Sequence, residues 1–282
     1  MTIEGVGMTA KMTAAGRARE SERPDRLFDD PLAAALAGEE GVRWMEEMRL
    51  PSTPVENPTI GPRTRYFDDL VVSSVEAGML QVVMVAAGMD TRAFRLPITP
   101  DAVVFELDED PVLAEKQAIL EHERAAPRCR RVPVPVDLED DSWPETLTAA
   151  GFDPDSPAVF VAEGLSWYLD EDENVRLLDH LAGLAVPGSR LGIDMVSHDF
   201  FENSAVAPFF ELAAARGVYW KFGTNDPAAF LAAHGWRAEV SDFDVVGRSF
   251  GRWPPPGISE EVAAGAAKAS GSFFISAERF EA

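Results

Sequence analysis

The chain has 282 residues, 46% of them hydrophobic and 26% charged, which is typical of a soluble globular protein with a sizeable core. Lys and Arg number 25 and Asp and Glu number 48, so the formal net charge is 25 − 48 = −23. A surface this acidic repels phosphate backbones and anionic lipids. We therefore expect neither nucleic acid nor a membrane surface as a partner.

One cysteine and four scattered histidines limit the redox and metal chemistry. Cys129 has no second cysteine for a disulfide, and no histidine lies at metal-ligand spacing from it. The first residues lack the pattern of a secretory signal, and the longest apolar run, near residues 79–89, is too short to span a bilayer. We expect a cytoplasmic protein without a metal site.

The N-terminal part is predicted to be helical. Alanine-rich sequence favours helix within residues 12–50, and Asp30-Pro31 fits an N-cap followed by proline at the first helical position. Four prolines break regular structure within residues 51–62, and helix is expected to resume over residues 63–78.

From residue 80 onward, short apolar runs alternate with helical stretches, which is typical of a parallel sheet with helices on both faces. A period-two run and a last strand then follow without a clear helix between them, which predicts an antiparallel pair closing the sheet. The predicted strands are 82–86, 103–107, 132–136, 158–162, 190–196, 239–246 and 272–277. The predicted helices between them are 110–125, 143–150, 171–185 and 226–234.

Ligands of an open parallel sheet bind beyond the carboxyl ends of its strands, so the residues after each strand are the candidates. After the first strand, Gly88 allows a sharp turn and a close approach of a ligand, and Asp90 adds negative charge. The turn lacks the G-x-G-x-x-G pattern that a dinucleotide pyrophosphate requires. A nicotinamide dehydrogenase is therefore the least favoured enzyme class.

Acidic residues follow the next strands. Asp108 lies roughly 20 residues after the glycine turn, the separation at which a carboxylate accepts hydrogen bonds from a ribose diol. Glu106 is the alternative for that role. After the third strand, Asp137 is placed to hold an adenine amino group, with the backbone of Leu138 meeting a ring nitrogen.

The fourth strand is followed by Glu163, which suits a cationic amino group, and by Trp167 and Tyr168, which suit an apolar pocket. Together these residues describe a nucleoside site that has acids and little phosphate-binding equipment. S-adenosylmethionine matches this description, because it combines a ribose, an adenine, an amino-acid group and a sulfonium cation without a phosphate.

Several motifs in this chain occur in the order found in one enzyme family. They comprise residues 27–33, 63–69, 85–96, 105–108, 136–138 and 162–169. On these motifs the sequence resembles the leucine carboxyl methyltransferase family, in its bacterial branch of S-adenosylmethionine-dependent methyltransferases. The likeness extends from about residue 12 to the end of the chain.

The resemblance implies an α/β, Rossmann-like class I methyltransferase fold. Its seven-stranded sheet would be mostly parallel, with an antiparallel strand near the C-terminus and helices on both faces. A helical cap would occupy residues 1–78 and the cofactor-binding domain residues 79–282, with an insertion at about 199–224 that covers the substrate pocket.

The resemblance also implies residue roles. Gly88 would line the cofactor, Asp108 would hold the ribose, Asp137 with Leu138 would hold the adenine, and Glu163 would meet the methionine amino group.

The methionine carboxylate would be bound by arginines in two pairs. One is Arg63 or Arg65, with a preference for Arg65 because it precedes the aromatic residues Tyr66-Phe67. The other is Arg17 or Arg19.

Family members methylate carboxylates, so we expect an O-methyltransferase acting on a small-molecule acid, a natural-product intermediate or a peptide C-terminus. A carboxylate is ionised at neutral pH and needs no catalytic base, and His198 would serve as one only for a hydroxyl acceptor. The alternatives are a hydroxyl or phenol O-methyltransferase and a non-catalytic S-adenosylmethionine-binding protein. Candidate substrate-pocket residues are Trp167, Tyr168, Phe201, Tyr219 and Trp220.

Overall fold

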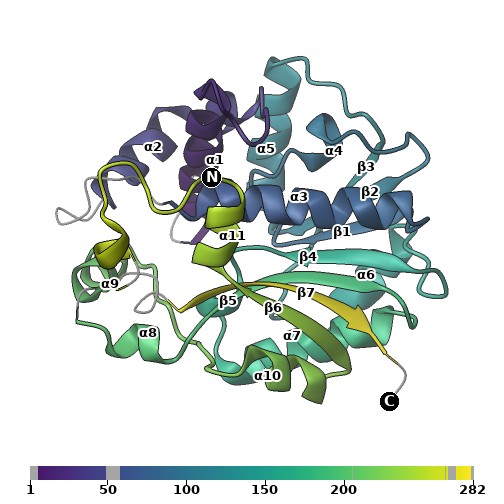
Figure 1. The fold of residues 1–282 in the computed structure, drawn as a ribbon. Coiled ribbons are helices and arrows are strands. Elements are labelled where there is room, and N and C mark those ends of the chain that lie inside the picture. Colours follow the sequence, from purple (N-terminus) through teal and green to yellow (C-terminus); the bar gives the residue numbers. More distant parts are fainter. Residues whose placement is uncertain (1–5, 49–57, 205, 264, 266–270, 281–282) are drawn as a thin grey trace.

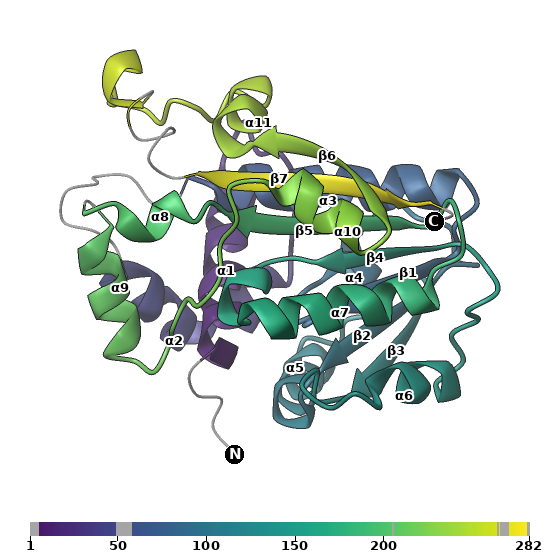
Figure 2. The ribbon, with the colours of Figure 1, turned by 90° about the horizontal axis from the view of Figure 1, so that it is seen from below.

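The computed structural model describes residues 6–48, 58–204, 206–263, 265 and 271–280. A seven-stranded sheet lies between two layers of helices (Figure 1; Figure 2). Its strand order is β3-β2-β1-β4-β5-β7-β6, and β7 runs antiparallel to both of its neighbours while the other pairs are parallel. The strands are β1 Gln81–Val85, β2 Val103–Asp108, β3 Arg130–Pro135, β4 Ala158–Ala162, β5 Arg190–Val196, β6 Trp236–Asp242 and β7 Ser272–Arg279.

This arrangement confirms the predicted class I methyltransferase fold, including the antiparallel pair at the end of the chain. Among the described helices none is long and apolar enough to cross a bilayer. The helices before the sheet are α1 Val6–Glu22, α2 Ala33–Glu47 and α3 Ile60–Glu76. The later ones are α4 Arg92–Arg95, α5 Asp110–His122, α6 Trp143–Ala149, η1 Ser166–Tyr168, α7 Glu171–Leu184, α8 Asp199–Glu202, α9 Ala207–Ala214, α10 Pro227–Ala233 and α11 Phe243–Ser249.

The predicted helical region within residues 12–50 contains two helices, and the second begins at Ala33 and not at Pro31, where the predicted cap placed it. Helix α2 begins at Ala33 with Leu32 as its N-cap residue. The Oδ1 of Asp30 accepts from the backbone N–H of Leu32 over 3.3 Å, in the turn before α2, and its Oδ2 accepts from Arg17 and Thr91, which compensate the buried charge. Most of the predicted break at residues 51–62 lies outside the described residues, and α3 begins at Ile60.

The predicted strand over residues 239–246 is half wrong. Strand β6 ends at Asp242, and α11 follows directly. The apolar residues of this run suit both periods, because Phe243 and Val246 are also spaced for one face of a helix. They are buried with Trp253 and Phe274 in one cluster, and this burial decides for the helix.

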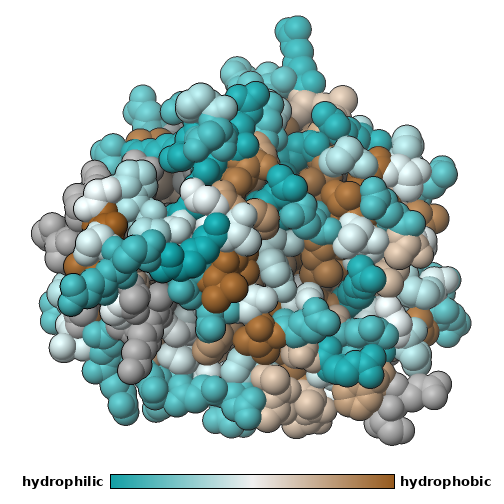
Figure 3. Space-filling view, in the orientation of Figure 1, coloured by the Kyte–Doolittle hydropathy of each residue, from teal (hydrophilic) through white to brown (hydrophobic). Residues whose placement is uncertain are grey.

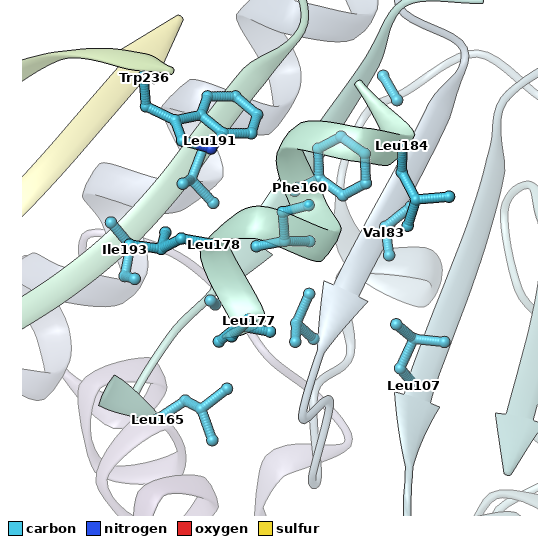
Figure 4. Close-up of a cluster of buried hydrophobic side chains, with 14 of the residues drawn as sticks. Val83, Leu107, Phe160, Leu165, Leu177, Leu178, Leu184, Leu191, Ile193 and Trp236 are labelled. Carbon is cyan, nitrogen blue, oxygen red and sulfur yellow. The ribbon is translucent and has the colours of Figure 1, made fainter. Parts of the chain in front are cut away.

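The face of the molecule seen in Figure 1 is largely hydrophilic, and apolar residues occur on it as separate patches (Figure 3). Beneath the surface, one apolar layer lies between the sheet and helices α6, α7 and α10 (Figure 2). In that layer Leu177 and Leu178 of α7 belong to the same buried cluster as Val83, Phe160 and Ile193 of the sheet (Figure 4).

Helix α3 packs on the opposite face of the sheet, where Phe67 and Val71 are fully buried. It approaches β5 at Gly192, where an added Cβ would lie 2.7 Å from Cδ2 of Leu70 and 2.9 Å from Cδ1 of Phe67. Only glycine fits this contact. The close approach brings the start of α3 to the carboxyl end of β5, and so positions Arg63 for the site.

Candidate cofactor and substrate site

A cavity of about 980 Å³ lies at the carboxyl ends of the parallel strands, a volume suited to a cofactor-sized ligand. Residues of α1, α2, α3 and α9 complete its walls. Of the predicted site residues, its lining contains Arg17, Arg63, Gly88, Asp90, Asp108, Asp137, Leu138, Glu163, Trp167, Tyr168, Tyr219 and Trp220. Arg65, His198 and Phe201 are not among its lining residues.

The glycine turn after β1 is held by Asp108. The backbone N–H of Gly88 donates to Oδ2 of Asp108 over 2.6 Å. Gly88 has a φ of 48°, and an added Cβ would lie 2.8 Å from the Cβ of Ala10. Glycine is therefore required both by the left-handed conformation and by the approach of α1.

Asp108 lies at the end of β2 and lines the cavity, as predicted. Burial raises the pKa of its carboxyl group, and the N–H groups of Gly88 and Glu109 partly offset that effect. The alternative, Glu106, is not among the lining residues: it is fully buried, and its Oε2 accepts from Lys116 and Arg131 over 2.8 Å each. Both of these cations come from elements that pack beside β2, which sequence alone does not place.

The adenine-side candidates follow β3. Asp137 is exposed, Leu138 is half-buried, and both line the cavity. Asp108 lies in register with Pro135, two residues before Asp137, so the two acids share one edge of the sheet. The Oδ1 of Asp137 accepts from the N–H of Glu139 over 2.9 Å, which orients the carboxylate.

Glu163, after β4, lies between two arginines. Its Oε1 accepts from Nε of Arg63 over 2.9 Å, and its Oε2 accepts from Nη2 of Arg92 over 2.8 Å. Burial alone would raise the pKa of Glu163, but Arg92 and Arg63 hold that pKa below its usual value. The carboxylate is therefore fixed in its ionised form at the cavity wall.

Arg92 is the hub of the buried charges. It is 1% exposed and also donates to Asp90 over 2.6 Å and to Asp68 over 2.8 Å. The guanidinium of Arg92 keeps the pKa of Asp90 low in spite of burial. Both oxygens of Asp90 accept from Arg92, so this predicted site residue faces the arginine as well as the cavity.

The two arginines of α3 point in different directions, and the preference for Arg65 is not supported. Arg65 is half-buried as a residue, with a side chain that is 40% exposed, and it pairs with Asp69 over 2.8 Å and donates to the carbonyl of Leu27. Residues two apart on a helix face different sides, and α3 turns the side of Arg63 to the cavity. Within the described part of the chain, Nη2 of Arg63 has no hydrogen-bond acceptor.

Arg17 of α1 lies in the cavity wall, whereas Arg19 does not. Arg17 is 5% exposed. Its side chain pairs with Asp30 over 2.9 Å and donates to the carbonyl of Met89. Arg19 pairs with Glu46 over 3.4 Å on the outer side of α1.

The other end of the cavity is aromatic. Trp167 and Trp220 stack with their ring centroids 4.8 Å apart, and Tyr168 and Tyr219 lie in the same wall. Phe201 stacks instead on Phe210, 5.5 Å away, outside the lining. His198, the residue before α8, is exposed and also lies outside it.

Comparison with known proteins identifies the relatives of this fold and site. Residues 10–182 match the family model described as leucine carboxyl methyltransferase. The chain belongs to the leucine carboxyl methyltransferase family. This confirms the resemblance seen in the sequence motifs.

Two bacterial relatives span most of the chain. A Parafrankia protein named as an S-adenosyl-L-methionine-dependent methyltransferase is 39% identical over 259 residues, which cover 86% of this chain and 80% of the relative. A similarly named protein of Streptomyces coelicolor is 37% identical over 255 residues, which cover 88% of this chain and 89% of the relative. The family member described here is an S-adenosylmethionine-dependent methyltransferase, as the sequence predicts.

Solved structures share the fold. A DUF574 family protein from Streptomyces avermitilis has a TM-score of 0.62 at 18% identity and covers 96% of this chain and 97% of its own. A protein from Thermobifida fusca described as a methyltransferase has a TM-score of 0.63 at 15% identity, with coverages of 99% and 96%. At these identities the likeness concerns the fold alone.

Two groups in the methyltransferase cavity escaped the sequence analysis. Asp194 lies inside the apolar run of β5, so it reads as part of a buried strand and not as a residue that follows one. Its Oδ1 accepts from the N–H of Gly164 over 2.7 Å and its Oδ2 from Nη1 of Arg63 over 3.1 Å. Burial raises the pKa of Asp194 to about 6. The other group is Lys221, which lines the aromatic end next to Trp220.

Proposed function

We propose that the protein transfers a methyl group to the carboxylate of an acid with an apolar or aromatic body, giving a methyl ester. The observation that carries this proposal is the charge at the aromatic end of the cavity. Lys221 lies there, with its ammonium 3.4 Å from Oε2 of Glu173, and the described lining contains no histidine. A cation next to aromatic walls suits an anionic group on an apolar acceptor.

The cofactor residues follow from the same cavity. We assign the ribose hydroxyls to Asp108 and the adenine to Asp137 and Leu138. Glu163 is assigned to the amino group, and Arg63 to the methionine carboxylate, supported by the Nη2 of Arg63 that has no acceptor among the described residues.

Arg17 is assigned to the same methionine carboxylate as Arg63, because it lies in the cavity wall on α1. The lining thus pairs acids and arginines with an amino-acid group and offers no glycine-rich cradle for phosphate, which fits S-adenosylmethionine.

In the mechanism, the bound cofactor supplies an electrophilic methyl group on a sulfonium sulfur. The protein aligns the acceptor oxygen and keeps water away from it. The stacked Trp167 and Trp220 form an apolar wall. The ammonium of Lys221 would exchange its 3.4 Å contact with Glu173 for the acceptor carboxylate. A carboxylate is already ionised at neutral pH, so no base is required. Orientation of the two reactants is worth roughly 7–11 kcal/mol of barrier.

The test uses acceptors in matched pairs. Phenylpropanoic acid is compared with phenylpropanol, and a peptide with a free C-terminus is compared with its amide. Each acceptor is incubated with S-adenosylmethionine, and the products are analysed by mass spectrometry. In each pair that reacts, we expect the acid to be methylated, giving a methyl ester that mild alkali cleaves. An alkali-stable product formed only from the alcohol would contradict the proposal and indicate a hydroxyl acceptor.

Two variants sharpen this test. Lys221→Gln is expected to lower kcat/KM for the acid about tenfold through KM, because the acceptor carboxylate loses its cation, while cofactor affinity stays unchanged. Arg237→Gln removes one positive charge from the surface of β6 and serves as the control, with unchanged kinetics. Equal kinetics of the two variants would show that Lys221 does not bind the acceptor.

A further inference from the structure

The buried ion network behind the cavity carries an uneven number of charges. We define this network by its ion pairs of 2.5–3.7 Å. Its members are the acids Asp30, Asp68, Asp90, Glu163 and Asp194 and the arginines Arg17, Arg63, Arg92 and Arg95. With every member ionised, five acids and four arginines leave one excess negative charge.

The excess is located by the number of arginines that each acid contacts. Asp30, Asp68 and Glu163 each lie between two arginines. Asp90 and Asp194 each contact one arginine. Asp90 accepts from both Nη1 and the backbone N–H of Arg92, over 2.6 and 2.7 Å. Asp194 has only Arg63, over 3.1 Å, and shares it with Glu163. Asp194 has one longer contact with its arginine where Asp90 has two shorter ones, so Asp194 is the least compensated carboxylate of the network.

Asp194 also faces the ligand. It lines the cavity at the end of β5, directly beside the loop that carries Glu163 and Gly164. Among the described residues, the charged neighbours of Asp194 are Arg63 and Glu163, while β7 places Phe274 opposite it in register and Ser166 of η1 bonds its backbone carbonyl. Its ionisation thus sets the net charge of this wall.

The cofactor and its product differ by one charge. S-adenosylmethionine has a sulfonium, an ammonium and a carboxylate and carries a net charge of plus one, whereas S-adenosylhomocysteine lacks the sulfonium charge and is neutral. We propose that Asp194 is a specificity-determining residue whose excess negative charge makes the site favour the cationic cofactor relative to the neutral product. This inference rests on the cofactor and not on the identity of the methyl acceptor.

A merely structural role predicts something different. If Asp194 only held Arg63 in place, its loss would weaken cofactor and product equally, because both carry the same amino-acid carboxylate. If Asp194 acts through charge, its loss weakens the cation alone, since charges interact over several ångströms in a water-poor cavity. The affinity ratio of the two ligands separates these roles.

The experiment measures the Kd of S-adenosylmethionine and of S-adenosylhomocysteine by calorimetry, without acceptor. Asp194→Asn is expected to lower the preference for S-adenosylmethionine, expressed as the ratio of the two Kd values, by about tenfold at pH 7.5. Sinefungin, which replaces the sulfonium with an amine cation, is expected to follow S-adenosylmethionine. Asp69→Asn removes an exposed carboxylate from α3 and serves as the control with an unchanged ratio.

The wild-type protein gives a second measurement that needs no variant. Asp194 has a pKa of about 6, so its charge is present at pH 7.5 and largely lost at pH 5. The preference for the cationic ligand is expected to rise with pH across this interval, and to stay flat in Asp194→Asn. A flat ratio in the wild-type protein, or an equal loss of both ligands in the variant, overturns the proposal.

Discussion

Two arginines on one helix illustrate how much a residue's role depends on its direction. Arg63 and Arg65 are separated by two positions, yet the first is buried against Glu163 and Asp194 and the second is half-buried and pairs with Asp69. A sequence motif names both, and only the rotation of α3 distinguishes them.

Arg63→Lys is expected to weaken S-adenosylmethionine at least tenfold, because lysine cannot reproduce the planar fork of hydrogen bonds that arginine offers a carboxylate. Binding of 5′-methylthioadenosine, which lacks the carboxylate, is expected to stay within about twofold. Arg65→Lys is the control and should change neither. Calorimetry with both ligands checks this, and a parallel loss for both ligands in Arg63→Lys would mean that the residue supports the fold instead.

Asp108→Ala is expected to weaken both ligands, in contrast to Arg63→Lys, which weakens only the one with a carboxylate. It removes the proposed acceptor of the ribose hydroxyls, a loss on the order of 1–3 kcal/mol, so both S-adenosylmethionine and 5′-methylthioadenosine should weaken about tenfold or more. Asp140→Ala, an exposed acid of the loop after β3, is the control and should bind both ligands normally. Unchanged affinity in Asp108→Ala would remove the ribose role from this residue.

At the scale of elements, the contact of α3 with β5 determines where the charges of the site lie. Gly192→Ala places a methyl group within 2.9 Å of Leu70 and Phe67, and is expected to cost roughly 1–3 kcal/mol of unfolding free energy. Because α3 carries Arg63, affinity for S-adenosylmethionine should fall as well. Urea unfolding and calorimetry measure the two effects.

The control for this variant is a glycine with space around it. Gly183 of α7 has no atom within 4 Å of an added Cβ, so Gly183→Ala should be neutral or stabilising by up to about 1 kcal/mol. Equal stability of Gly192→Ala and the wild-type protein would show that α3 can move without cost, and would weaken the argument that this contact fixes the site.

The sequence predicts elements best where burial is simplest. Residues 190–196 are mostly apolar and are the strand β5 to the residue. The run at 239–246 fits two periods, and only its packing against Trp253 decides between them. Asp194 and Lys221 were missed because their importance comes from neighbours distant in the chain, such as Arg63, which no local pattern reveals.

At the scale of the whole molecule, the acids of the network respond to pH in opposite ways. The pKa values of Asp30, Asp90 and Glu163 are lowered by their arginines, so their stabilisation is present above about pH 4 and is lost as the pH falls through those lowered values. The pKa of Asp194 is raised from 3.8 to about 6. The stability that its protonated form contributes is therefore fully present below pH 3.8 and is lost as the pH rises through 6.

Acidification from pH 7.5 to pH 5 is therefore expected to stabilise the ligand-free wild-type protein relative to Asp194→Asn, by on the order of 1–3 kcal/mol. Reduced repulsion among the surface acids affects both proteins alike, so the difference between them isolates Asp194. Urea unfolding at the two pH values measures it. Parallel pH dependences of the two proteins would contradict the raised pKa.

The cavity is assembled from the two extremes of the described chain. Ala10 of the first helix and Phe274 of the last strand line it together. A molecule still being synthesised has no such enclosure until β7 has inserted between β5 and β6. Ligand binding stabilises only a state that possesses the site. S-adenosylmethionine therefore stabilises a newly made copy only once β7 is in place between β5 and β6.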